Sequence, residues 1–173
     1  GYGYFNLMQT IPALFFIIVD FGFNAVAMKD LEENWDNAKK YYFNILWMRI
    51  VLATVLIVVT AFSINKFFPY PSDLKLGIYL SLALILTHAL YATGNLIFQF
   101  RLRYDYSVIG YILGSVAVLV LSIVLIWQNA SVVWVNFTYV VGGLITFGAS
   151  LFYLNKLGVA YDKKTKIDFG LWK

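Results

Sequence analysis

Two charged residues of this sequence lie inside long apolar stretches, where a charge needs a partner. Asp20 stands within the apolar run 11–29, and Arg49 stands just inside the start of the next run. An ionised group at membrane depth costs roughly 2.5–3.5 kcal/mol on insertion scales unless it faces a partner or a wet cavity. Asp20 lies roughly 12 Å from the end of its run, and Arg49 lies roughly 7 Å from the start of the next. An arginine side chain can span this difference in depth. The two residues therefore predict an ion pair, which either binds a substrate or coupling ion or joins two adjacent helices.

A second signal is a stripe of polar residues along the apolar run 76–98. Its members, at steps of 7, 3, 4 and 4, are Ser81, His88, Tyr91, Asn95 and Gln99. These steps place them on one face of a helix, and such a stripe must face protein or water rather than lipid. The stripe predicts a hydrophilic pathway, with His88 near the bilayer midplane as a titratable or hydrogen-bonding group. The alternative is hydrogen bonding between packed helices.

The elements that must position these residues are long apolar runs separated by polar links. The chain has 173 residues, 61% hydrophobic and 13% charged, whereas a soluble domain is about a quarter charged. Each run is long enough to cross a hydrocarbon layer about 30 Å thick. The predicted spans are about 8–28, 45–64, 76–98, 107–127 and 132–154. The sequence thus predicts an all-α membrane bundle of five transmembrane helices in a single domain, followed by a basic tail at 155–173.

The distribution of lysine and arginine predicts the orientation of the chain. The links 29–44 and 99–106, the tail and Arg49 together hold 11 of the 13 basic residues, and the other side holds Lys66 and Lys75. The positive-inside rule places the richer side in the cytoplasm, with the amino end of the chain outside. The charged and aromatic link 29–44 suits a short interfacial helix.

Other features restrict the function. Small residues at four-residue spacing, such as Gly110 and Gly114 or Gly142 and Thr146, favour close helix packing. With no cysteine and a single histidine, a structural metal site is not expected, and neither is a cofactor. The sequence contains no nucleotide-binding loop, zinc-protease motif or nucleophile elbow, so we expect no enzyme activity. The excess of basic residues belongs to membrane topology, and no nucleic-acid partner is expected.

Four motifs carry a resemblance to a known family. They are GYGYFNLMQTI before the first span, DFGFNAVAMKD at its end, NILWMR at the start of the second, and FQFRLRY after the third. Together they resemble the polysaccharide flippases of the MOP superfamily, which export O-antigen and other repeat units. The resemblance implies a partial chain that covers the second to sixth helices of the amino-terminal lobe. The remaining helices of a two-lobe parent, the bilayer and a lipid-linked oligosaccharide are then its partners.

The resemblance also implies a substrate and a site. Such proteins move undecaprenyl-diphosphate-linked sugars across the bacterial inner membrane through a cavity between two lobes. Basic side chains would attract the diphosphate, polar ones would hydrogen-bond the substrate, and Asp20 would act as a counter-ion or couple transport to a cation. The residues expected to contact substrate are Asn24, Arg49, His88, Tyr91, Asn95, Gln99 and Arg101. The alternatives are a multidrug or metabolite exporter of the same superfamily, a membrane glycosyltransferase or polymerase acting on lipid-linked sugars, and a structural subunit.

Overall fold

The computed structural model describes residues 2–20 and 38–159, and these residues form helices and short links without a strand. Five helices follow one another along the chain: α1 (Tyr2–Asp20), α3 (Ala38–Phe67), α4 (Ser72–Phe100), α5 (Tyr104–Trp127) and α6 (Val132–Lys156). All five are long and apolar enough to cross a membrane. The predicted all-α bundle of five transmembrane helices is therefore confirmed.

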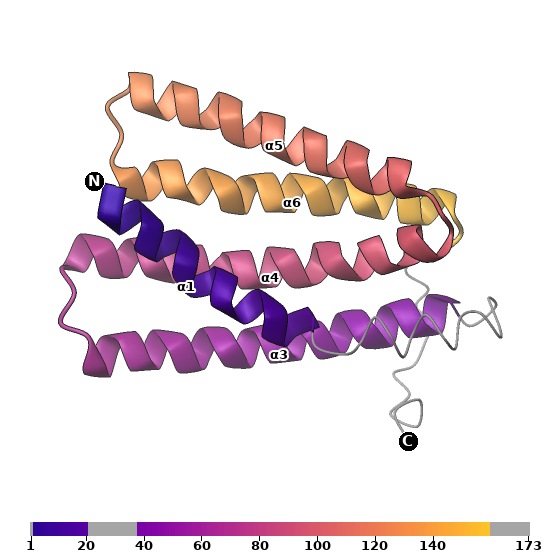
Figure 1. Ribbon diagram of the computed structural model, residues 1–173, viewed down its shortest axis with the longest axis horizontal. Coiled ribbons are helices and arrows are strands. Elements are labelled where there is room, and N and C mark those ends of the chain that lie inside the picture. The colour runs from indigo at the N-terminus through magenta and orange to yellow at the C-terminus, as the bar shows by residue number, and fades with distance from the viewer. Residues whose placement is uncertain (1, 21–37, 160–173) are drawn as a thin grey trace.

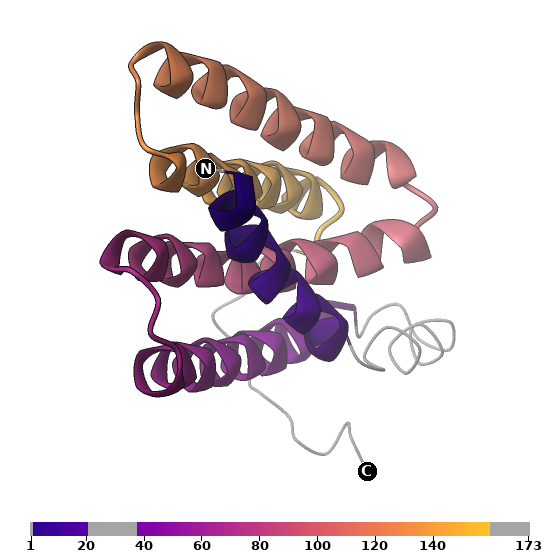
Figure 2. The same ribbon diagram turned by 60° about the vertical axis from the view of Figure 1, so that its left-hand side comes forward.

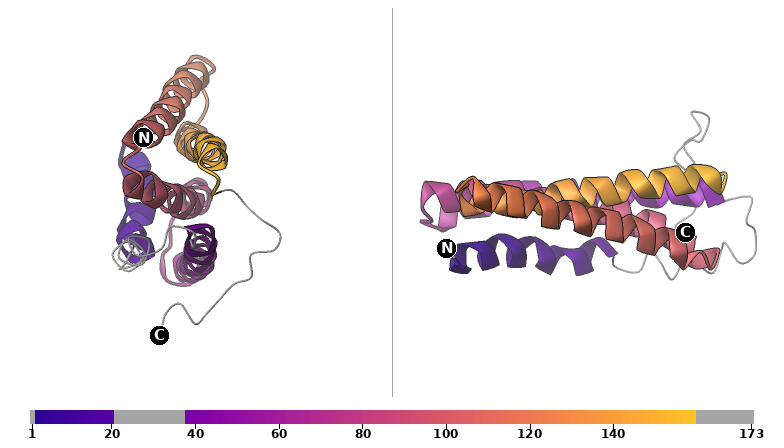
Figure 3. Two further views of the ribbon diagram at one scale, coloured as in Figure 1. Left: turned by 90° about the vertical axis from the view of Figure 1, so that its right-hand side faces the viewer. Right: turned by 90° about the horizontal axis from the view of Figure 1, so that it is seen from above.

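The helices α3 to α6 run antiparallel to their chain neighbours, and α1 crosses them on one side (Figures 1 and 2). In Figure 1, α5, α6, α4 and α3 follow one another across the molecule, and the view from above places α1 on one face of this group (Figure 3). The most extensive contacts join α5 to α6 and α4 to α6, followed by α3 to α4 and α1 to α4. Helix α4 is accordingly the most buried of the five and forms the centre of the bundle.

Three of the helices end in the same hydrogen-bonded turn. After α4, the N–H of Arg103 donates to the carbonyl of Phe98 over 2.8 Å while Leu102 adopts a φ of 53°. The ends of α5 and α6 repeat this geometry, with Asn129 at φ 55° and Gly158 at φ 74° in the equivalent position. This arrangement is a Schellman cap, which satisfies the last carbonyls of a helix and reverses the chain within a few residues. It keeps the links α4–α5 and α5–α6 short and their helices adjacent.

Two predicted helix starts differ from the structure. Helix α3 begins at Ala38 instead of about 45, so residues 38–44 belong to a spanning helix and not to a separate interfacial one. The reason is that no glycine or proline interrupts 38–67 and that Tyr41 and Tyr42 pack into the core. Helix α1 begins at Tyr2 instead of about 8, and its predicted continuation to 28 lies outside the described residues. Helices α4, α5 and α6 differ from their predicted bounds by four residues or fewer.

Close backbone approach holds α5 against α6. A Cβ added to Gly114 would lie 2.6 Å from the backbone oxygen of Gly142 and would also collide with the side chain of Thr146. A Cβ on Gly142 would collide with Val118. The predicted packing role of these small residues is confirmed, because only residues without a side chain at these positions allow this contact.

Candidate functional site

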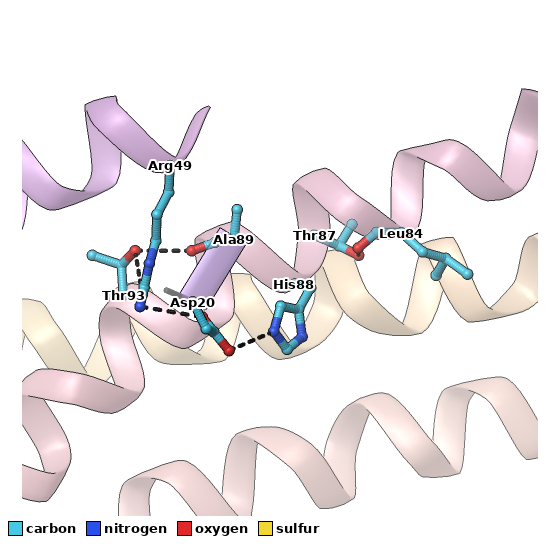
Figure 4. A network of polar contacts seen from close by, with 7 residues as sticks. All are labelled: Asp20, Arg49, Leu84, Thr87, His88, Ala89 and Thr93. Atoms are coloured by element: carbon cyan, nitrogen blue, oxygen red, sulfur yellow. Dashed lines mark hydrogen bonds and ion pairs between the residues drawn. The ribbon is translucent and has the colours of Figure 1, made fainter. Parts of the chain in front are cut away.

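The predicted partners Asp20 and Arg49 lie in contact, and His88 joins them (Figure 4). Arg49 Nη2 lies 3.2 Å from Asp20 Oδ1, and His88 Nε2 lies 2.9 Å from Asp20 Oδ2. The three residues come from α3, α1 and α4, so a single carboxylate joins three helices. Each of its oxygens faces a different basic group, which compensates the charge of an acid at membrane depth.

Arg49 is fully buried, with 0% of its side chain exposed. Its Nη1 donates to the hydroxyl of Thr93 over 3.1 Å, and that hydroxyl donates to the carbonyl of Ala89 over 2.8 Å. A guanidinium cannot lose its charge in a protein, so burial requires the negative charge of Asp20. The position of Arg49 follows from the early start of α3, which places it about three turns into that helix.

The imidazole of His88 is held on two sides. Its ring stacks on Phe16, with centroids 4.1 Å apart and planes 5° from parallel. Because a carboxylate only accepts hydrogen bonds, Nε2 must carry the hydrogen that points at Asp20. The neutral form is therefore the Nε2–H tautomer, whose Nδ1 is a bare acceptor. The side chain is 26% exposed, in contrast to Arg49.

A cavity of about 710 Å³ lies beside this cluster, between α1, α4, α5 and α6. His88 and Phe16 line it on the side of the cluster. Hydroxyl and amide groups are spread over an otherwise apolar wall: Gln9, Thr87, Tyr91, Tyr111, Ser115, Ser122, Tyr139 and Thr146. Its volume is in the range of a pocket for a small molecule or for part of a larger one. Among the described residues that line it, none is a lysine or an arginine.

The residues of the polar stripe of α4 hydrogen-bond to different neighbouring helices. Ser81 accepts a hydrogen bond from Asn136 of α6, whereas His88 faces Asp20 of α1. Tyr91 and Asn95 both contact the hydroxyl of Ser107 in α5, over 2.9 Å and 2.7 Å. Interhelical hydrogen bonding therefore accounts for much of the stripe, and His88 and Tyr91 are its members on the cavity wall.

The remaining predicted site residues lie away from the cavity or outside the described residues. Gln99 is half-buried near the end of α4, and Arg101 is the exposed residue that follows that helix. Arg101 is eight residues beyond Thr93, the residue of α4 that Arg49 contacts, which is roughly 12 Å along the helix axis. Arg101 thus caps the end of α4 and is not among the residues that line the cavity. Asn24 lies outside the described residues.

Sequence reasoning missed a second polar junction, which lies near the middle of α1. Gln9 Nε2 donates to Asn136 Oδ1 over 2.7 Å, and Asn136 donates in turn to Ser81, whose hydroxyl donates to the carbonyl of Gly77. Gln9 and Asn136 are amides inside apolar runs, the same signal that identified Asp20. Together with the cluster at Asp20, this junction connects α1 to the bundle at two places, near the middle of the helix and at Asp20. In the described part of the chain, no group of three or more His, Cys, Asp or Glu residues could hold a metal ion.

Five spanning helices around a buried charge cluster and a cavity define an integral membrane protein with several membrane crossings. Residues 1–169 match the family model described as "Polysaccharide biosynthesis protein", and the chain belongs to this family. The predicted resemblance to the polysaccharide flippases is thereby confirmed. Members of the family are generally transporters and not enzymes, and the family is generally found in the bacterial inner membrane. Neither the curated proteins nor the solved structures include a significant match to this chain.

Proposed function

We propose that this chain is part of a flippase that moves undecaprenyl-diphosphate-linked oligosaccharide units across the bacterial inner membrane. The observation that carries the proposal is the family match over residues 1–169. The physical features agree with it, because a lipid-linked sugar has hydroxyls and an anionic head that hydrocarbon rejects. A cavity with hydroxyl groups and aromatic rings on its wall offers such a head an alternative to lipid.

The proposed mechanism is alternating access, in which one lobe rocks against another around a fixed site. This chain would supply helices of one lobe, and further helices of the parent protein would close the other side of the cavity. The contacts of α1 with Asn136 near its middle and with Arg49 and His88 at Asp20 support a rigid body. Substrate contacts are proposed at His88 and Tyr91, which are on the cavity wall.

The roles proposed for the two arginines differ. Arg49 is buried against Asp20, so we propose that it acts on the substrate through the cluster, by holding Asp20 and thereby His88 in place. Arg101 is exposed at the end of α4 and would attract the diphosphate before it enters. Asn95, Gln99 and Asn24 remain proposed sugar contacts in a conformation that exposes them. The amino end of the chain is proposed to lie outside, with Lys39, Lys40 and both ends of the α4–α5 link in the cytoplasm.

A multidrug exporter for organic cations is the alternative within the superfamily. It would require an acidic side chain that is available to the substrate. Both carboxylate oxygens of Asp20 face basic groups of the chain, so the geometry favours an anionic substrate over a cationic one. A glycosyltransferase or polymerase would instead release a longer sugar chain, which the assay below detects.

The deciding experiment is reconstitution of the intact protein in liposomes with a fluorescent undecaprenyl-diphosphate oligosaccharide. We expect the labelled sugar to become accessible to a membrane-impermeant glycosidase from the opposite side, with its length unchanged. Replacing Arg49→Ala should abolish this movement at an unchanged protein level, because Asp20 then loses the partner that fixes it. Arg103→Ala is the matched control, because Arg103 forms an exposed ion pair with Asp105 at the start of α5 and neither residue is among those that line the cavity. Transport that is unchanged in Arg49→Ala would remove Arg49 from the mechanism, and a lengthened sugar would indicate an enzyme.

A further inference from the structure

Among its described residues, the cavity wall has one side chain that can take up a proton to become a cation. No lysine or arginine is among the described residues that line the cavity, and His88 is the one histidine of the chain. Its ring is on the wall, partly exposed, and is fixed by the stack on Phe16 and the hydrogen bond to Asp20. Among the described residues on this wall, a protonated His88 is therefore the cation that an anionic ligand would meet.

The charges around His88 can be counted in each of its states. The groups that face it are Asp20 from α1 and, beyond that carboxylate, Arg49 from α3. The other titratable side chains on the cavity wall are Tyr91 of α4, Tyr111 of α5 and Tyr139 of α6. A guanidinium cannot lose its proton in a protein, so Arg49 keeps its charge in both states of His88.

With neutral His88, the charges of Arg49 and Asp20 cancel and the cluster is neutral. A proton added to Nδ1 of His88 breaks no hydrogen bond found among the described residues, since Nε2–H continues to donate to Asp20. The cluster then carries a net charge of +1, next to a cavity with an apolar wall. A positive charge in such surroundings is screened less than one in water and attracts an anion strongly.

We propose that the cavity binds an anionic head group together with one proton, which is taken up at Nδ1 of His88. This inference rests on the proposed function, in which the substrate carries a diphosphate. His88 makes the binding of that group depend on pH. The charges of Asp20 and Arg49 cancel, so the cluster is neutral until His88 takes up a proton. Tyr139 places a further hydroxyl group on the cavity wall.

The test measures the binding of dimethyl diphosphate, an anion whose charge is constant from pH 5.5 to 8.5, to the purified intact protein. Because one proton accompanies each anion, the affinity of the unaltered protein should fall about tenfold per pH unit above the pKa of His88. His88→Gln should bind weakly and without this slope. His88→Lys, which keeps a cation at the site, should bind equally across the range. Arg103→Gln removes a positive charge away from the cavity and should leave both affinity and slope unchanged.

A second measurement observes the proton directly. The imidazole signal of His88 in an NMR titration, assigned by its loss in His88→Gln, should shift its midpoint to higher pH when the diphosphate is added. Linkage requires this, because a proton that strengthens anion binding must itself be bound more tightly in the presence of the anion. A purely structural His88 would alter stability and leave the midpoint unmoved.

The outcomes separate this inference from the proposed function. Binding of the diphosphate with no pH slope, an unmoved midpoint, or a slope retained in His88→Gln would each overturn the role of His88. So would an absence of binding at every pH. Translocation of the lipid-linked sugar in liposomes is read independently, so transport with pH-independent binding refutes only this inference. A failure of transport refutes the flippase proposal whatever the binding shows.

Discussion

Asp20 determines the local chemistry of this chain, because it compensates a guanidinium that has no exposure to solvent. Arg49 has its charge balanced by this carboxylate and its Nη1 bonded to Thr93. His88 depends on the same carboxylate for its tautomer and its orientation. The loss of Asp20 therefore affects two basic residues at once.

We predict that Asp20→Asn destabilises the protein strongly. An uncompensated buried charge typically costs about 3–5 kcal/mol, so the thermal unfolding temperature in detergent should fall by many degrees. The double variant Asp20→Asn with Arg49→Met, which removes both charges, should recover a large part of this loss. Asp105→Asn is the control, because its ion pair with Arg103 is exposed and should contribute little. If Asp20→Asn unfolds at the temperature of the unaltered protein, Arg49 does not depend on this charge.

The ion pair of Asp20 with Arg49 could be predicted from the sequence, whereas the contact with His88 could not. Depth in a spanning helix follows from counting residues, and the two charges have matching depths. The contact with His88 also depends on how α1 is rotated about its own axis. This rotation is set by packing, which includes Met8 in the space left by Gly77, and it cannot be found by counting residues. The same limit applies to Thr93 and Ser107, because hydroxyl residues are common in membrane helices and give no distinct signal. Arg101 was expected to attract the diphosphate as Arg49 does, and the structure places it at the end of α4 and not among the residues that line the cavity.

At the scale of the helices, the contact of α5 with α6 depends on the absence of side chains at two glycines. We predict that Gly114→Ala lowers stability by about 1–3 kcal/mol, because its Cβ would force the two backbones apart. Gly148→Ala is the matched control in α6. Nothing lies within 4 Å of its added Cβ, so it should stabilise the helix by about 0.5–1 kcal/mol. Denaturation of both variants in the same detergent measures the difference, and equal effects would contradict the packing assigned to Gly114.

The cap of α4 permits a stabilising substitution. Leu102 holds a left-handed conformation at φ 53° with 76% of its surface exposed, so its side chain contributes little burial in return for the strain. We predict that Leu102→Gly raises stability by about 1 kcal/mol, the cost of this conformation for a residue with a Cβ. Gly158→Ala, at the equivalent position after α6, should have the opposite sign. A lower unfolding temperature for Leu102→Gly would indicate that the leucine has a contact worth more than the strain.

At the scale of the whole molecule, the alternation of basic and weakly basic links matches the antiparallel order of the helices. The structure places Lys39, Arg101 and Lys156 at one end of the bundle and Lys66 and Lys75 at the other, as five alternating crossings require. The number of crossings could be predicted because each span is a long apolar run with a clear interruption. The start of α3 could not, because lysine and tyrosine near a membrane surface suit an interfacial helix and a continued spanning helix equally.

The side of the membrane that each link occupies can be tested with single cysteines, because the chain has none of its own. Leu102 and Asn129 are exposed residues of the α4–α5 and α5–α6 links, which lie at opposite ends of the bundle (Figure 1). We predict that in intact spheroplasts an impermeant maleimide labels Asn129→Cys and not Leu102→Cys, and that it labels both after permeabilisation. The reason is that the positive-inside rule places the arginine-flanked α4–α5 link in the cytoplasm. Labelling of Leu102→Cys alone in intact spheroplasts would invert the orientation, and the diphosphate would then approach Arg101 from the outer side.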